Sequence, residues 1–228
     1  MLADSLCMGC MEPKYDGRCP NPQSCGWIEG TPPQSPLQLP PRTILEQRYV
    51  LGKVLGQGGF GITYLSAELN KAEKLALKEY FPSSFATRGT DRRTVIYASP
   101  DTRAPYQYGL ERFEDEGRTL LQFRDHANIV SVVNFFRSNG SGYIVMEYLD
   151  GVTLQEYLRQ QPGGRLSLDQ TLRILVPIMD ALRAVHQAGI THRDISPDNI
   201  YLCRSGRIKL LDFGAARHAF ETKRAASN

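Results

Sequence analysis

A glycine-rich stretch and a lysine that follows it are the first residues in this chain with a spacing suited to phosphate chemistry. Residues 56–61 read GQGGFG, and glycines allow a tight hairpin to bring backbone N–H groups close to phosphates. Alone this motif is weak evidence, because a plain glycine-rich turn has the same spacing. A dinucleotide-binding fold requires a helix directly after the motif, whereas residues 62–69 alternate like a strand. Lys78, on the next strand-like stretch, is on its own equally consistent with a solvated edge charge.

Polar residues near the C-terminal end supply a possible base and possible metal ligands. Asp194 and Asn199 follow a long helical stretch, and Asp212 comes thirteen residues after Asn199. Oxygen ligands from Asn199 and Asp212 suit Mg²⁺, and Asp194 can accept a proton, which together suit phosphoryl transfer. Glu116, in a helical stretch at 110–123, taken singly reads as a surface glutamate. The order of all these elements along one chain makes a purely structural origin improbable.

This order resembles the protein kinase family, specifically the eukaryotic-like serine/threonine kinases of bacteria. The resemblance extends from about Tyr49 to the C-terminus. It rests on GQGGFG (56–61), LALK (75–78), Glu116, DHANIV (125–130), VMEYLDG (145–151), HRDISPDN (192–199) and DFGAAR (212–217).

The resemblance implies a role in ATP binding for residues of the first half. In the family, the glycine-rich loop covers the phosphates, and the strand lysine holds the α- and β-phosphates while it pairs with a helix glutamate. The matching residues here are Gly56, Gly58, Gly61, Lys78 and Glu116.

The resemblance also implies roles for residues between the two halves and in the second half. Asp194 is expected to accept the proton of the substrate hydroxyl, and Asn199 and Asp212 to bind Mg²⁺. The backbones of Glu147 and Leu149 are expected to hydrogen-bond adenine. Met146 would lie behind the adenine pocket, and the column that marks an active arrangement would comprise Leu120, His192 and Phe213.

Departures from the family pattern keep alternatives open. Ser196 stands where serine/threonine kinases usually carry a lysine near the γ-phosphate. Glu116 is preferred over Glu114 and Glu111 because it precedes Leu120 by one helical turn.

The leading interpretation is an ATP-dependent protein serine/threonine kinase that acts in signalling. A nucleotide-binding pseudokinase or scaffold and a small-molecule phosphotransferase of kinase-like fold are the alternatives.

Four cysteines crowd the first 25 residues in a C-x2-C-x8-C-x5-C pattern. The first pair has the spacing at which two thiolates reach one tetrahedral zinc ion, and no histidine occurs before position 126. We therefore expect a structural Zn²⁺ bound by four thiolates in a small zinc-ribbon-like module. Disulfides and inert thiols are the alternatives. The proposed ligands are Cys7, Cys10, Cys19 and Cys25.

Composition limits the partners. The chain has 228 residues, 41% of them hydrophobic and 22% charged, which is typical of a globular protein. A net charge of +3 gives no indication of a nucleic-acid partner. The sequence lacks a membrane-spanning stretch and a recognisable export signal, so we expect a cytoplasmic protein with ATP and a protein substrate as partners. Its oligomeric state is left open.

The expected organisation is an α+β, two-lobe kinase fold preceded by the cysteine module. Residues 1–29 form the module, and residues 30–47 form a linker in which five prolines favour an extended chain. Residues 48–228 form the kinase domain, with a β-rich lobe at about 48–148 and a helical lobe at 149–228. The sequence stops fourteen residues after Gly214, so we expect the helical lobe to be incomplete and the activity of this chain to be low.

Overall fold

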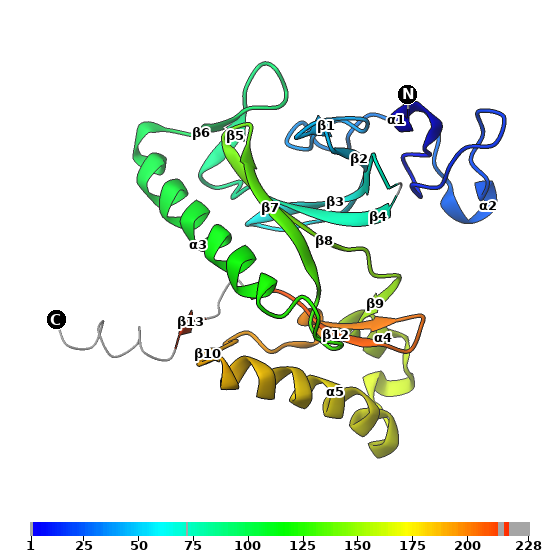
Figure 1. Cartoon of the computed structure of the whole chain (residues 1–228), viewed down its shortest axis with the longest axis vertical. Coiled ribbons are helices and arrows are strands. Elements are labelled where there is room, and N and C mark those ends of the chain that lie inside the picture. Colours follow the sequence, from blue (N-terminus) through cyan, green and yellow to red (C-terminus); the bar gives the residue numbers. More distant parts are fainter. Residues whose placement is uncertain (1, 72, 214–216, 219–228) are drawn as a thin grey trace. The chain divides into compact units, whose positions relative to one another are not determined.

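A six-stranded antiparallel sheet organises the first of two units in this computed structural model, which describes residues 2–71, 73–213 and 217–218 (Figure 1). The first unit comprises residues 1–117 and 132–148, and the second comprises residues 118–131 and 149–228. The strand order is β1-β2-β3-β4-β8-β7. The strands are β1 (Ile44–Leu45), β2 (Tyr49–Gln57), β3 (Gly61–Glu68), β4 (Glu73–Tyr80), β7 (Val132–Ser138) and β8 (Ser141–Glu147).

The central strands β4 and β8 are buried on both faces. Helix α3 (Arg103–Leu121) lies along one face of the sheet (Figure 1). The opposite face is covered by residues 37–43 and by a hairpin of β5 (Ala86–Arg88) and β6 (Val95–Tyr97). Because successive side chains of a strand point to opposite faces, neighbouring residues of β4 enter two different environments.

Helix α3 begins seven residues before the stretch 110–123 that helical spacing predicts. Ser99 and Thr102 form reciprocal capping bonds around a 3-10 turn at Pro100–Thr102, and α3 follows that turn directly. The helix then approaches the sheet closely at Gly109, where a Cβ atom would lie 2.0 Å from the Tyr80 hydroxyl. This close approach brings the second half of α3 within reach of β4.

Residues 2–47 pack on the same unit as the sheet. Leu6, Met8 and Met11 share a buried hydrophobic cluster with Val50 and Leu65. The carbonyl of Met8 accepts a 2.9 Å hydrogen bond from the backbone of Lys53, and Lys74 pairs with Glu12 at 2.8 Å. Short helices α1 (Leu2–Ser5) and α2 (Pro22–Cys25) belong to this segment. The division into module, linker and kinase domain stays a prediction.

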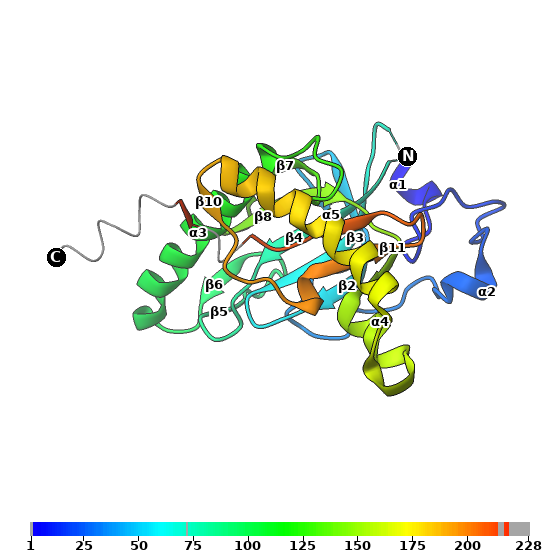
Figure 2. The ribbon, with the colours of Figure 1, turned by 90° about the horizontal axis from the view of Figure 1, so that it is seen from below.

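The second unit is built on helices and short strands. Helix α5 (Leu168–Gln187) runs as one continuous helix (Figure 2). It begins with a capping box of Ser167 and Gln170 and contains Pro177 in its interior. The other elements are β9 (Gly151–Thr153), α4 (Leu154–Gln160), β10 (Ile190–Thr191), β11 (Ile200–Cys203), β12 (Ile208–Leu210) and β13 (Arg217–His218). Strands β12, β11 and β9 form one sheet, and β10 pairs with β13.

Helix α5 is amphipathic, and several of its large apolar side chains are exposed. Ile174, Ile178, Ala181 and Val185 are buried within the second unit. The exposed apolar residues are Leu168, Leu172, Leu175, Val176 and Met179. Among the described residues, none of the helices combines the length and apolar character needed to cross a membrane.

Candidate functional site

The glycine-rich segment forms the hairpin between β2 and β3. The N–H of Gly58 donates to the carbonyl of Gly61 at 2.9 Å, which closes the turn. A Cβ atom at Gly61 would lie 2.6 Å from the carbonyl oxygen of Glu79, so only glycine fits there. Nothing lies within 4 Å of the Cβ positions of Gly56 and Gly58. The space beside these two glycines is therefore open on the side where a side chain would project.

Lys78 and Glu116 form an ion pair inside the first unit. Lys78 Nζ on β4 lies 2.9 Å from Glu116 Oε1 on α3. The Glu116 side chain is 5% exposed, whereas the Lys78 side chain keeps 23% exposure. Glu114 instead pairs with Arg137, and Glu111 is exposed. Of the three candidate glutamates, Glu116 is the one whose carboxylate reaches Lys78 at hydrogen-bond distance.

The strand that leads to the expected adenine-binding segment lies next to β4. Met146 and Glu147, at the end of β8, are register partners of Ala76 and Leu75. Both are partly buried and belong to the first unit, whereas Leu149 belongs to the second. In the second unit the Tyr201 hydroxyl donates to the carbonyl of Leu149 at 3.2 Å.

The second unit brings Asp194 and Asn199 together. The side-chain amide of Asn199 donates to Asp194 Oδ2 at 2.9 Å and to the Asp194 carbonyl at 3.0 Å. The backbone N–H of Leu211 donates to the carbonyl of Asn199 at 2.8 Å, which brings the residue before Asp212 next to this loop. Asp194, Asn199 and Asp212 therefore lie on two adjoining loops of one unit.

Two residues of these loops have a backbone that L-amino acids rarely adopt. Arg193 has φ +69° and Asp212 has φ +53°. Such conformations are strained and persist when surrounding contacts hold them, which is common at functional sites. Gly214, the last residue of the DFG motif, lies outside the described residues.

His192 connects these loops from within the core. Its Nδ1 accepts from the backbone N–H of Asp194 at 3.3 Å, and its Nε2 lies 3.0 Å from the carbonyl of Leu211. Burial lowers the pKa of His192, so the neutral ring can accept at Nδ1 and donate at Nε2. The His192 ring meets Phe213 edge-on at 4.6 Å, and Phe213 packs on Phe123 at 6.3 Å. These contacts fix the position of Asp194 relative to Asp212.

The four N-terminal thiols converge on one point. All four sulfur atoms lie within 4.8 Å of one another, with Cys7 and Cys25 3.8 Å apart and Cys10 and Cys19 3.6 Å apart. Zinc–sulfur bonds of about 2.3 Å place tetrahedral thiolates about 3.8 Å apart, whereas a disulfide requires about 2.05 Å. Burial raises the pKa of Cys10 to about 12, so a cation is needed to hold it as a thiolate. The donor set and its spacing fit Zn²⁺.

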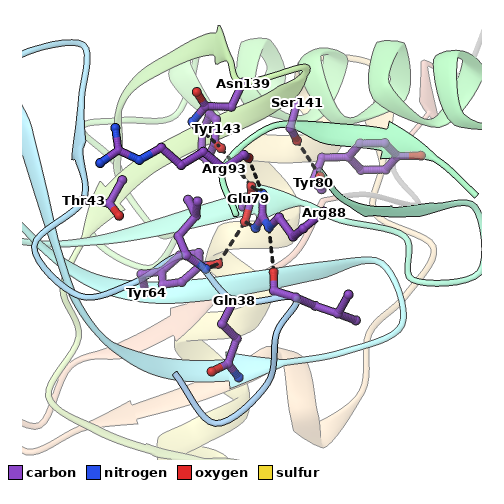
Figure 3. A network of polar contacts seen from close by, with 12 residues as sticks. Gln38, Thr43, Tyr64, Glu79, Tyr80, Arg88, Arg93, Asn139, Ser141 and Tyr143 are labelled. Carbon is purple, nitrogen blue, oxygen red and sulfur yellow. Dashed lines mark hydrogen bonds and ion pairs between the residues drawn. The ribbon is translucent and has the colours of Figure 1, made fainter. Parts of the chain in front are cut away.

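A buried polar network on β4 was not anticipated from the sequence. Glu79, next to Lys78, is fully buried and accepts hydrogen bonds from Arg88, Tyr64 and Tyr143 (Figure 3). Strand alternation at Lys78 offers a signal, since it places Glu79 on the opposite, buried face, where a charge needs a partner. The identity of that partner depends on a hairpin that local patterns do not reveal.

Comparison with known proteins identifies the family. Residues 49–228 match the family model described as "Protein kinase domain". The chain belongs to the protein kinase family. A solved structure described as "PpkA-294 apo form" superposes on 84% of this kinase chain and 67% of its own chain, with TM-score 0.74 and 32% identity. The expected α+β kinase fold is confirmed.

Curated relatives include bacterial serine/threonine kinases. A "Probable serine/threonine-protein kinase" of Streptomyces coelicolor is 34% identical over 174 residues, covering 75% of this kinase chain and 23% of the relative. "Serine/threonine-protein kinase PknA" of Nostoc sp. is 34% identical over 183 residues, covering 78% of this chain and 29% of the relative. The chain thus spans about a quarter of the length of these relatives.

Proposed function

We propose that this chain is the ATP-binding and catalytic part of a protein serine/threonine kinase that acts in signalling. The observation that carries the proposal is the Lys78–Glu116 ion pair at 2.9 Å, with a partly exposed ammonium group. Phosphoryl transfer needs positive charge held at the phosphates more than it needs covalent help from the protein. Lys78 is placed by Glu116 to supply that charge to the α- and β-phosphates. Gly56, Gly58 and Gly61 would cover the phosphates.

The second unit would supply the proton acceptor and the metal ligands. The oxygen of a serine or threonine hydroxyl attacks the γ-phosphorus, the bond to the β–γ bridging oxygen breaks, and ADP leaves. Asp194 takes the hydroxyl proton, and its bond from the Asn199 amide orients its carboxylate. Asn199 and Asp212 carry the oxygen ligands that Mg²⁺ prefers, and Mg²⁺ supplies charge neutralisation at the phosphates. Glu147 and Leu149 would bind adenine through their backbones.

We further propose that Cys7, Cys10, Cys19 and Cys25 bind one structural Zn²⁺. Sulfur separations of 3.6 and 3.8 Å across the cluster support this proposal. The segment has only two short helices of its own beside its packing on the sheet, so the metal would stabilise its fold. A cytoplasmic location remains the expectation from the sequence.

Replacement of the proposed base tests the enzymatic part. In this and the later transfer assays the full-length kinase is used, because the 228-residue chain is expected to have low activity. Asp194→Asn should reduce transfer of labelled phosphate from Mg-ATP to a generic protein substrate by about 100-fold or more, with unchanged ATP affinity. Asp198→Asn is the matched control, because it makes the same change at an exposed position of the same loop. Equal phosphorylation by wild type and Asp194→Asn would refute the assignment. ATP binding without transfer by the wild type would favour a pseudokinase, and transfer only to small hydroxyl compounds a small-molecule phosphotransferase.

Metal analysis tests the zinc proposal. Protein purified without chelator should contain one zinc per chain, which Cys10→Ser should lose and Cys203→Ser should keep. Trp27 follows Cys25 closely and is the single tryptophan of the chain, so its fluorescence reports on this segment. Chelation should shift Trp27 emission to longer wavelength, while the far-UV circular dichroism of the sheet changes little. Zinc-free protein with unchanged Trp27 emission would contradict the proposal.

A further inference from the structure

Residues 37–39 pass over the face of the sheet that contains the Glu79 network. The carbonyl of Leu37 accepts a 2.8 Å hydrogen bond from Arg88 Nε, and the N–H of Leu39 donates to the Tyr64 hydroxyl at 3.0 Å. Arg88 and Tyr64 each donate to the carboxylate of Glu79 as well. The backbone on both sides of position 38 is thereby fixed to the interior of the sheet.

Gln38, between these two anchors, reaches the glycine-rich loop. Its side-chain nitrogen donates to Gln57 Oε1 at 2.8 Å, and its side-chain oxygen accepts from the backbone of Gln34 at 3.0 Å. Gln38 is only 6% exposed, so its amide has little access to water as an alternative partner. Gln57 is exposed and lies between Gly56 and Gly58.

This contact has a direct consequence for the loop. Glycine-rich backbone loses much conformational freedom when it adopts a single conformation, and that loss reduces affinity for a ligand. A bond from a rigid segment to Gln57 restricts the loop before any ligand arrives. The anchoring of Leu37 and Leu39 makes Gln38 such a rigid donor.

We propose that residues 37–39 are a positioning element for the glycine-rich loop, with Gln38 as the residue that holds it. The element prepares the backbone of Gly56 and Gly58 to receive the phosphates of a nucleotide. This inference rests on the proposed ATP-binding function. It gives the proline-rich stretch a part in nucleotide binding that a linker would not have.

Two independent variants remove the same bond. Gln38→Ala removes the donor, and Gln57→Ala removes the acceptor at an exposed position. Each should weaken Mg-ATP and Mg-ADP binding about 2- to 10-fold, the range that one hydrogen bond allows. The double variant should be no weaker than either single variant. Gln34→Ala, which leaves the backbone donor of Gln34 in place, should bind like wild type.

Adenosine separates loop positioning from general damage to the sheet. It has no phosphates, so its affinity should be unchanged in Gln38→Ala and Gln57→Ala. The unfolding midpoint of Gln57→Ala should fall only slightly, because the change leaves one buried donor of Gln38 without its acceptor. Additive losses in the double variant, or equal losses for adenosine and ATP, would overturn the proposal.

Hydrogen exchange of residues 56–61 without nucleotide makes the test independent of catalysis. Exchange should be faster in both single variants than in wild type and Gln34→Ala. If the wild type binds no nucleotide, the proposed function fails, while the exchange rates still decide whether Gln38 restrains the loop. Unchanged exchange in both variants would refute the restraint itself.

Discussion

The two faces of β4 hold similar charged pairs in different ways. Lys78 and Glu79 are neighbours, and strand alternation sends them to opposite faces of the sheet. On one face Lys78 pairs with Glu116 of α3, and its side chain keeps 23% exposure. On the other face Glu79 pairs with Arg88, and these side chains are 0% and 4% exposed.

The difference in exposure indicates that Arg88–Glu79 is a structural ion pair, whereas Lys78–Glu116 is suited to ligand binding. Arg88 and the hydroxyls of Tyr64 and Tyr143 satisfy both oxygens of Glu79. Burial acts to lower the pKa of Arg88, but the hydrogen bond to Glu79 and the electrostatic attraction of Glu79, Tyr64 and Tyr143 together outweigh it, so that pKa is raised. Burial also raises the pKa of both tyrosines, so their hydroxyls stay protonated and can donate at neutral pH. The ammonium group of Lys78 is partly exposed and can still bind an anion from solvent.

The largest expected effect on stability comes from the structural pair. Arg88→Met should lower the free energy of unfolding by about 3–5 kcal/mol, because it leaves Glu79 buried without its counter-charge. Urea denaturation followed by circular dichroism measures this loss. Arg92→Met, at an exposed position of the same hairpin, should lie within about 0.5 kcal/mol of wild type. A similarly small effect of Arg88→Met would contradict the structural role of the Arg88–Glu79 pair.

Disruption of the Lys78–Glu116 pair on the other face should reduce activity more than stability. Glu116→Gln should reduce phosphate transfer about 10- to 100-fold, because Lys78 loses the charge that orients it, and this corresponds to about 1.4–2.7 kcal/mol. The unfolding free energy should change by less than it does in Arg88→Met. Steady-state kinetics with Mg-ATP give the first quantity and urea denaturation the second. Glu114→Gln, on the same helix, is the control, and an equal loss of activity there would contradict the choice of Glu116.

Removal of a hydroxyl group that donates to Glu79 should have the smallest effect on stability. Tyr64→Phe and Tyr143→Phe each remove one of the hydrogen bonds to Glu79 and should cost about 1–2 kcal/mol in unfolding free energy. Tyr15→Phe, at a residue 78% exposed, should leave stability unchanged. Thermal unfolding of the three variants ranks them, and a neutral result at both buried tyrosines would show that Arg88 alone satisfies the carboxylate.

Local sequence signals predict the strand at 62–69 and a strand that contains Lys78, and both are present as β3 and β4. The family match confirms the resemblance that the order of the motifs indicates. The spacing of Glu116 and Leu120 selected the glutamate that meets Lys78. The start of α3 was missed, because capping at Ser99 and Thr102 extends the helix past the apolar pattern. The Arg88–Glu79 pair was also missed, since it joins a short hairpin to β4 and leaves no periodic signal. Long-range pairing of this kind is fixed by tertiary packing.

The most direct test of the account is Lys78→Met, with phosphate transfer and unfolding measured on the same preparation. The account predicts that transfer from Mg-ATP to protein falls at least about 100-fold. The unfolding free energy should fall by less than it does in Arg88→Met: Glu116 loses its counter-charge, but the Lys78 side chain keeps 23% exposure, so the site is less fully buried than the Arg88–Glu79 pair. Lys71→Met, at an exposed lysine between β3 and β4, should retain full transfer. Retained transfer in Lys78→Met, or a loss of stability as large as that of Arg88→Met, would contradict the account.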